Sequence, residues 1–488
     1  MNFTRREALG LVAGAGAFAV GLEGCAPSAS LKAPTRVADA DARFLNRAGY
    51  GVRPEEIEGL KRKGRVAWID AQLTPGGEPL ALSWALARIP ATSLLAWELR
   101  DWPKRDVIRQ AQQTDLLYAV YSPWQLRERM VDFWTNHFNI YGNKGLAAYR
   151  IPTDQREVVR RHALGSFPDM VAASAKSTAM LLYLDQQASH YGKPNENYAR
   201  ELLELHTLGV SGGYSQQDVM EVARCFTGCT EERRSTFRRV SEDGSIGNPQ
   251  GTFRFDERLH DTGEKTVLGE TIPSGGGIED GERVIEIVTR HPSTARHIAH
   301  KLCRYFVGDD APLLEATVAA AYLQEPVGDI ARMLKSILLW ERFDVSAPTF
   351  KRPFDYVVSA LRVLDADSDC NSGVLRHIEA MGQPTHLWPM PDGYPMDAAS
   401  WNGSVLGRWN FAIQLCSNRI KGTKVDVEKL AQRYGTSAVG GWSNVVLRGS
   451  TMPDSAIREA VESRSFVGFG EFQAASALSL CSMGFQWK

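Results

Sequence analysis

Helical periodicity runs through most of the chain and constrains its fold more than any other feature. Apolar residues recur three and four positions apart over 106–121, 197–208, 293–306 and 327–339. This spacing places an apolar stripe along one side of a helix, and such a stripe is buried against other helices. Between about 231 and 274 the spacing changes, and Phe253 and Phe255 alternate with polar residues. The sequence therefore predicts a mainly α fold, a large multi-helix globular domain with a small β-hairpin insertion near 245–272.

The length of the chain, 488 residues, allows more than one arrangement of these helices. A single hydrophobic core stops growing at about 250–300 residues. We therefore expect a helical domain over 39–488. Whether it forms one body or two lobes, 39–230 and 281–488, with the β insertion between them, is left open by the sequence.

The first 25 residues are typical of an export signal and not of a folded domain. Arg5 and Arg6 follow a hydroxyl residue and precede an apolar stretch over 9–22, which is shorter than the ~20 apolar residues that span a bilayer. This pattern predicts a twin-arginine (Tat) signal peptide over 1–25. Residues 22–25 read Leu-Glu-Gly-Cys, which is similar to a lipobox, the motif in which the cysteine, here Cys25, is acylated.

Two ways of processing this signal are open. Acylation of Cys25 would anchor the protein to a membrane through its lipid, whereas cleavage near 26–29 would leave it without one. Residues 26–38 are small and polar and include two prolines, as in a flexible tether. We expect export by the twin-arginine route, and a protein that is periplasmic or membrane-anchored at the cell envelope.

The charge balance argues against a nucleic-acid partner. The chain has 56 basic and 57 acidic residues and a formal net charge of −1, whereas nucleic-acid binding rests on an excess of positive charge. The His-Glu-x-x-His motif and the phosphate-binding P-loop are both absent, which disfavours a zincin and a P-loop enzyme. Six cysteines remain besides Cys25, and export permits disulfides among them, but their spacing does not identify the pairs.

Polar residues share one face of the helix expected over 197–208. At ~100° per residue, Asn197, Glu201 and Glu204 lie within ~60° of one another, and Arg200 borders them. Two carboxylates and an amide on one face are half of a site for a divalent metal. They are equally an ordinary solvated face on which Arg200 pairs with Glu204. His206 projects into the apolar arc of the same helix, which favours a hydrogen-bonded core histidine.

A second histidine, His137, lies on the apolar stripe of the segment 126–138, together with Phe133 and Trp134. A histidine on such a stripe is buried and needs a partner, because an unpaired buried imidazole costs free energy. The partner is either a backbone carbonyl, or a metal or carboxylate from another helix.

Two further segments carry candidate residues. His260, Asp261 and Lys265 lie on a turn between two short strands; an aspartate followed two positions later by glycine is normal turn chemistry, but His260 could also point into a site. The segment 383–402 is a long loop rich in prolines and aromatic residues, among them Trp388 and Trp401. Long structured loops are often functional.

Taken together, these segments resemble a bacterial family called domain of unknown function 1800. The resemblance rests on an ordered series of motifs between about 40 and 417, at 133–138, 161–167, 195–209, 213–219, 260–265 and 291–296. It implies a large, mostly helical and often exported protein, with a sulfatase-like neighbour protein as a partner. It implies no established reaction, and the family offers no agreed catalytic residues to carry over.

Two functions follow from these observations, and the sequence leaves open whether the protein is an enzyme. In the first, the segments 133–138, 195–206 and 260–265 converge on a buried site of an envelope enzyme, hydrolytic or redox, in which His137, Glu201 and Glu204 bind a divalent metal or act as acid and base. In the second, the protein is a non-catalytic envelope binding or assembly lipoprotein, which recognises a polymer or a partner protein through the aromatic loop.

Overall fold

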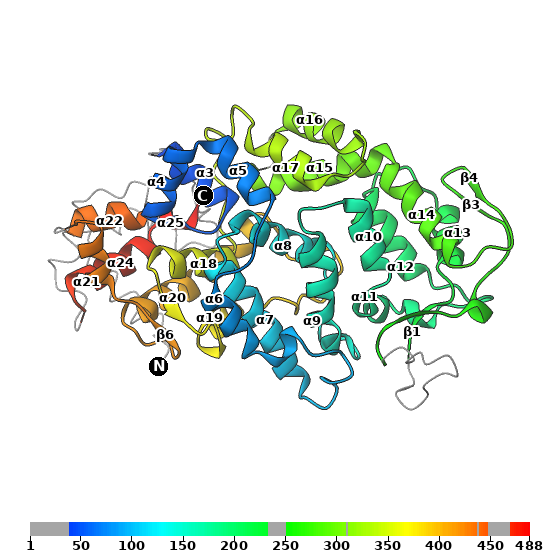
Figure 1. Ribbon diagram of the computed structural model, residues 1–488, viewed down its shortest axis with the longest axis horizontal. Coiled ribbons are helices and arrows are strands. Elements are labelled where there is room, and N and C mark those ends of the chain that lie inside the picture. Colours follow the sequence, from blue (N-terminus) through cyan, green and yellow to red (C-terminus); the bar gives the residue numbers. More distant parts are fainter. Residues whose placement is uncertain (1–38, 233–249, 309–310, 437–438, 448–468) are drawn as a thin grey trace.

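The computed structural model describes residues 39–232, 250–308, 311–436, 439–447 and 469–488 (Figure 1). The predicted export signal with Arg5, Arg6 and Cys25, and the predicted tether, lie outside the described residues. Within the described residues, no helix is both long enough and apolar enough to cross a membrane.

Helices make up most of the described chain, so the prediction of a mainly α fold is confirmed. The first half contains α3 (Ala40–Ala48), α4 (Pro54–Lys63), α5 (Arg65–Leu73), α6 (Leu80–Ala87), α7 (Lys104–Tyr121), α8 (Gln125–His137), α9 (Ile151–Asp154), α10 (Phe167–Ala175), α11 (Thr178–Tyr183), α12 (Glu196–Glu201) and α13 (Gln216–Cys225). Two π-helices, η4 (Gln155–Arg160) and η6 (Leu202–Thr207), continue α9 and α12 without a break.

The second half is helical as well. It contains α14 (Ile278–Arg290), α15 (Pro292–Phe306), α16 (Pro312–Leu323), α17 (Ile330–Leu338), α18 (Pro353–Val363), α19 (Ser372–Ala380), α20 (Val405–Cys416), α21 (Val427–Arg433), α22 (Val439–Leu447), α24 (Glu471–Cys481) and α25 (Met483–Gln486). Short 3-10 turns occur at Pro90–Thr92, Ala147–Tyr149, Gln186–Ala188, Glu257–Leu259 and Ala399–Ser404.

The β structure is small. The strands at 253–255, 265–267 and 270–272 lie in the insertion predicted near 245–272, whereas those at 229–231, 367–368 and 423–424 lie outside it. Strands β1 (Cys229–Glu231) and β2 (Phe253–Phe255) pair antiparallel, and so do β3 (Lys265–Val267) and β4 (Glu270–Ile272). The insertion therefore consists of two separate two-stranded sheets. A third pair, β5 (Asp367–Ser368) and β6 (Thr423–Lys424), joins distant parts of the second half.

The helices enclose two main hydrophobic cores. The first takes its residues from positions 42 to 343, and the second combines positions 82–120, together with Tyr50, with positions 354–485. Figure 1 shows α6 and α7 beside α18, α19 and α20, as the second core requires. The cores thus group helices from both ends of the chain, and the lobe boundaries expected from the sequence stay a prediction.

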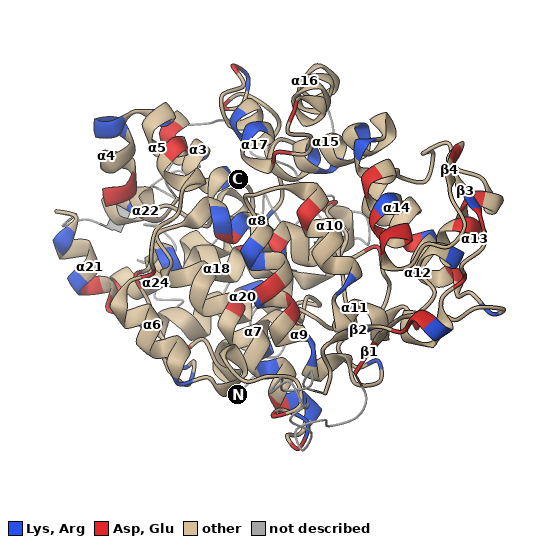
Figure 2. Ribbon diagram, turned by 45° about the vertical axis from the view of Figure 1, so that its right-hand side comes forward, with Lys and Arg blue, Asp and Glu red and all other residues tan. Residues whose placement is uncertain are grey.

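Local signals explain where several helices begin. Ser215 and Asp218 cap each other's backbone N–H groups at the start of α13, which is the capping-box arrangement. Helix α8 begins at Gln125, and just before it Ser122 Oγ accepts from the Trp124 N–H. Charges of both signs are spread over the helices (Figure 2), which agrees with the net charge near zero.

Candidate functional site

The segment predicted to carry the polar face departs from a regular helix in its second half. Residues 196–201 form α12, but 202–207 form the π-helix η6, which a uniform rotation of ~100° per residue does not describe. Gly209 ends it with a φ of 85°, and its N–H reaches back to the Leu203 carbonyl at 3.2 Å. Single π turns are frequent at functional sites.

Two histidines from other helices donate to the end of this π-helix. His137 Nε2, from α8, lies 3.1 Å from the His206 carbonyl oxygen, and His297 Nε2, from α15, lies 3.1 Å from the Leu205 carbonyl oxygen. The last carbonyls of a helix have no partner within it, so these N–H groups satisfy two of them. For His137, which is buried, the backbone carbonyl is thus the partner that the structure shows.

The other ring nitrogen of His137, Nδ1, contacts the amine of a lysine. Lys301 Nζ, also on α15, lies 2.8 Å from His137 Nδ1. A carbonyl only accepts, so His137 carries its proton on Nε2 and offers the Nδ1 lone pair to an N–H of Lys301. Lys301 is half-buried, and His137 is its one hydrogen-bond partner within the described part of the chain.

Burial disfavours the charged forms of His137, His206, His297 and Lys301 by lowering their pKa values. It lowers the pKa of His137 well below its usual value, with a further lowering by the charge of Lys301. Burial and Lys301 also lower the pKa of His206 to about 3 and that of His297 to about 4. Burial lowers the pKa of Lys301 to about 8, against the opposing effect of the Asp392 carboxylate. These shifts favour the neutral forms of the three imidazoles and make the Lys301 ammonium easier to deprotonate than that of an exposed lysine.

The predicted polar face is only partly assembled. Burial, and then the neighbouring Glu204 carboxylate, raise the pKa of Glu201. Glu204 accepts a long hydrogen bond of 3.4 Å from Tyr214 Oη. The expected pairing of Arg200 with Glu204 is wrong, because the Arg200 guanidinium lies 3.2 Å from the carboxylate of Glu196, one turn earlier.

Asn197, the amide expected on the same face, is exposed and donates to the Leu184 carbonyl at 3.2 Å. It therefore fastens α12 to the end of α11 and does not join the two glutamates in a shared contact. His206, by contrast, is buried as the sequence predicts, with its ring 5.0 Å from that of Phe138 and 5.9 Å from that of His137.

The aromatic loop is fastened to the end of α8. Asn136 exchanges two hydrogen bonds with the backbone of Tyr394, at 3.0 and 2.8 Å, and Asn139 donates to the carbonyls of Trp388 and Met390. The loop carries Asp392, whose charge raises the pKa values of Lys301 and Glu201. The aromatic loop and the His137 site, which the two functions expected from the sequence use separately, thus lie side by side.

The donor set present does not fit the predicted metal site. Both ring nitrogens of His137 are engaged, one by a carbonyl and one by the Lys301 amine. Across the described residues, no group of three or more His, Cys, Asp or Glu side chains is placed to hold a metal ion. His137 and Glu201 are therefore available for positioning and proton transfer and not as metal ligands.

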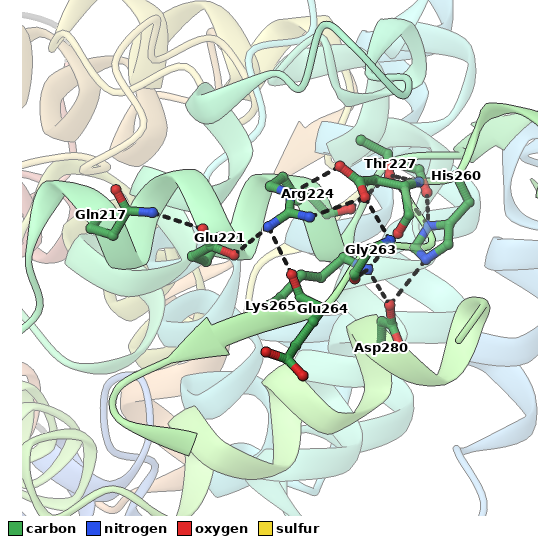
Figure 3. A network of polar contacts seen from close by, with 10 residues as sticks. Gln217, Glu221, Arg224, Thr227, His260, Gly263, Glu264, Lys265 and Asp280 are labelled. Atoms are coloured by element: carbon green, nitrogen blue, oxygen red, sulfur yellow. Dashed lines mark hydrogen bonds and ion pairs between the residues drawn. The ribbon is translucent and has the colours of Figure 1, made fainter. Parts of the chain in front are cut away.

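The turn with His260, Asp261 and Lys265 forms a separate buried network with α13 and α14 (Figure 3). Lys265 Nζ donates to three acceptors, the carbonyls of Asp261 and Gly263 and, at 2.6 Å, Asp280 Oδ2. All three N–H bonds of its ammonium group are thereby used.

The rest of this network is equally complete. His260 contacts the Thr227 carbonyl through Nδ1 at 2.8 Å and Asp280 Oδ2 through Nε2 at 3.1 Å. Both ring nitrogens of His260 are thus engaged by neighbouring groups of the network. The Asp261 carboxylate receives two hydrogen bonds from Arg224, which lower the pKa of Asp261.

This turn does not join the His137 site. No hydrogen bond or ion pair among the described residues connects residues 260–265 with His137, Lys301 or Glu201. Its groups are paired with one another, which agrees with a structural role in holding the β3–β4 sheet on α13 and α14.

Sequence reasoning missed Lys301 and Asp392. Lys301 follows His297 by four positions on α15, so the two share one helical face. A lysine on a face with buried neighbours is the signal that could have identified it. Asp392 offers no comparable signal, because only the path of the loop brings it to Lys301.

Comparisons with known proteins give a family and no function. No curated protein and no solved structure matches the chain. A family model described as "Protein of unknown function (DUF1800)" matches residues 43–486, which is nearly the whole described chain. The chain belongs to this family, DUF1800, as the motifs of its sequence predict.

Proposed function

We propose that the protein is an exported cell-envelope enzyme with hydrolytic acid–base chemistry, centred on Lys301 and Glu201. The observation that carries the proposal is the amine of Lys301, which is held by the lone pair of a neutral imidazole and has a pKa of about 8. Amines with a pKa lowered toward neutrality serve as general bases and nucleophiles.

The pKa values of Lys301 and Glu201 shift in opposite directions, and each shift brings the pKa closer to neutral pH. Burial lowers the pKa of Lys301, which favours its free amine, and raises the pKa of Glu201, which favours its protonated carboxyl. Pairs of groups perturbed in this way are typical of acid–base catalysts. In the proposed reaction Lys301 takes a proton from water or from a substrate hydroxyl, and Glu201 protonates the leaving group.

His137 acts as a positioning residue in this proposal. Its Nε2–H is fixed on the His206 carbonyl, so its Nδ1 lone pair faces Lys301 Nζ and orients one N–H of the amine. The aromatic loop supplies a surface beside the site, with Trp388 half-buried and its Nε1 donating to Asp392. Envelope polymers are the proposed substrate class, on the basis of the N-terminal export signal in the sequence.

The pKa of Lys301 gives a direct test that needs no known substrate. A small amine-reactive reagent is applied across a pH series, and modification of Lys301 is followed by mass spectrometry. We expect a midpoint near pH 8, against the ~10.4 of an ordinary lysine. Asp392→Asn should lower the midpoint further, because the carboxylate raises the pKa of Lys301. A midpoint at about 10 would refute the acid–base role.

Turnover is tested on a panel of chromogenic esters, amides and glycosides. We expect a bell-shaped pH profile in the wild type, because Lys301 must be deprotonated and Glu201 protonated, and we expect loss of activity in Lys301→Met. His137→Gln should shift the pH profile and retain part of the activity. Unchanged hydrolysis in Lys301→Met would place the reaction elsewhere. Binding of an envelope polymer that survives Lys301→Met, without turnover in the wild type, would favour the binding-protein alternative.

A further inference from the structure

Helix α6 presents an unusual outer face. Its eight residues, Leu-Ala-Leu-Ser-Trp-Ala-Leu-Ala, contain no charged side chain, as the uniformly tan ribbon of α6 in Figure 2 indicates. Leu82 and Leu86 are buried in the second core, but Leu80 is 65% exposed and Trp84 is 64% exposed. Large apolar side chains gathered on an outer face mark a contact with a partner or a membrane.

A cleft of about 990 Å³ opens beside this helix, between α6, α7 and the β5–β6 pair. Ala85 of α6 lies in its wall. Its charged lining residues are four cations and two carboxylates, Arg88, Arg109, Lys421, Lys424, Asp367 and Asp369. The lining is therefore net positive.

Three of these cations have no ion-pair partner. Arg109 lies 3.3 Å from Asp106, but among the described residues no ion pair involves Arg88, Lys421 or Lys424. Of the two carboxylates, Asp369 accepts the Asn371 N–H at 3.0 Å. Asp367 lies opposite Lys424 in the register of the β5–β6 pair. The cleft can accordingly accept negative charge from a ligand.

The apolar face and the basic cleft adjoin each other. Arg88 follows Trp84 by four positions, which is about 40° around a helix, and Ala85 and Arg88 both line the cleft. Tryptophan is typical of membrane–water interfaces, where its ring lies at the level of the headgroups. Arginine and lysine beside it are placed to meet the phosphates of an anionic membrane surface.

We infer that this face docks on an anionic lipid bilayer, with Leu80 and Trp84 in the interface and the cleft cations on headgroup phosphate. A second copy of the chain fits less well, because two large apolar side chains fall far short of the ~800 Å² per partner of a stable interface. The inference is independent of the proposed hydrolytic site, which uses none of these residues.

The predicted acylation of Cys25 fits this inference. One acyl chain alone gives only marginal membrane binding, and stable attachment needs a second signal. The thirteen residues from 26 to 38 reach at most ~45 Å when extended, so an anchored domain would stay near the bilayer. The docking face would be that second signal.

The test uses the full chain carrying Cys25→Ser, so that no lipid is attached, and vesicles of phosphatidylglycerol or of phosphatidylcholine. We expect binding to phosphatidylglycerol that weakens with salt. The double variant Leu80→Ser/Trp84→Ser should weaken it about ten-fold or more. Arg88→Glu/Lys421→Glu should remove the preference for phosphatidylglycerol. Tyr191→Ser, at a distant tyrosine that is 67% exposed, is the matched control and should bind as the parent does.

Every variant keeps the apolar N-terminal segment, which could itself bind vesicles. Residue-resolved oxidation therefore measures whether Leu80 and Trp84 of α6 make the contact. On phosphatidylglycerol vesicles we expect Trp84 to be protected from hydroxyl radicals and Tyr191 to stay reactive. Equal oxidation of Trp84 with and without vesicles would overturn the inference, even where the chain sediments with them. So would a double variant that changes the protein from dimer to monomer without lipid, since the face would then be a contact between copies.

Discussion

Replacement of Lys265 by methionine should cost more stability than replacement of any exposed lysine. Lys265 is buried and its ammonium group serves three acceptors, the Asp261 and Gly263 carbonyls and the Asp280 carboxylate. Methionine preserves most of the side-chain volume but donates nothing. The variant therefore leaves one buried carbonyl, one part-buried carbonyl and one buried carboxylate short of a partner.

Two routes give a similar magnitude for this loss. Unsatisfied neutral groups cost about 1 kcal/mol or more each, and a charged acceptor costs about 1.5–3 kcal/mol, which adds to about 4 kcal/mol. Breaking a buried ion pair by removing one partner costs about 3–5 kcal/mol. Asp280 keeps His260 as a partner, so the lower part of that range applies. For a folded part of ~450 residues, about 4 kcal/mol corresponds to a Tm lower by about 4 °C.

Thermal and urea unfolding of the purified protein measure this loss. Lys335→Met is the control, because Lys335 pairs with Asp70 in an ion pair in which both side chains are about half exposed, and such pairs contribute about 0–1 kcal/mol. Equal losses in Lys265→Met and Lys335→Met would refute the view that this turn is a structural network.

Two further predictions concern single buried positions. Burial raises the pKa of the Asp154 carboxyl to about 6, above its value of ~3.9 in the unfolded chain. The unfolded chain therefore loses this proton first, and the folded protein loses stability as the pH rises from about 4 to 6. Asp154→Asn should thus be more stable than wild type above pH 6, by up to about 3 kcal/mol, and equal near pH 4 in unfolding measured against pH. Gly393 has a φ of 77°, and a Cβ there would lie 2.2 Å from the Asn136 carbonyl oxygen, so Gly393→Ala should loosen the loop 383–402 in hydrogen exchange. Gly435→Ala, with a φ of 67° and open space around it, separates the backbone strain from the clash.

The fold class could be read from the sequence because it depends on local signals. Apolar periodicity identified helices such as those over 106–121 and 293–306. The alternation of Phe253 and Phe255 placed the β insertion. How the helices share two cores could not be read in the same way, because the second core joins segments separated by more than 200 positions.

The candidate site was only half predictable, for a geometric reason. His206 is buried, as the rule of ~100° per residue predicted, although it lies in the π-helix at 202–207, to which that rule does not strictly apply. The burial of His137 followed from its stripe, and its carbonyl partner was one of two alternatives. Lys301 and Asp392 reach the site through tertiary packing, which no spacing in one helix reveals.

The π-helix and the proposed base depend on each other through one imidazole. The end of η6 leaves the His206 carbonyl without a backbone donor, and His137 Nε2–H fills that role. Filling it fixes the proton on Nε2, and only then is Nδ1 a lone pair that can accept from Lys301. The carbonyls at the end of any helix need such donors, so the end of η6 accounts for the tautomer of His137. That tautomer orients the amine of Lys301, whose pKa of about 8 is the basis of the proposed function.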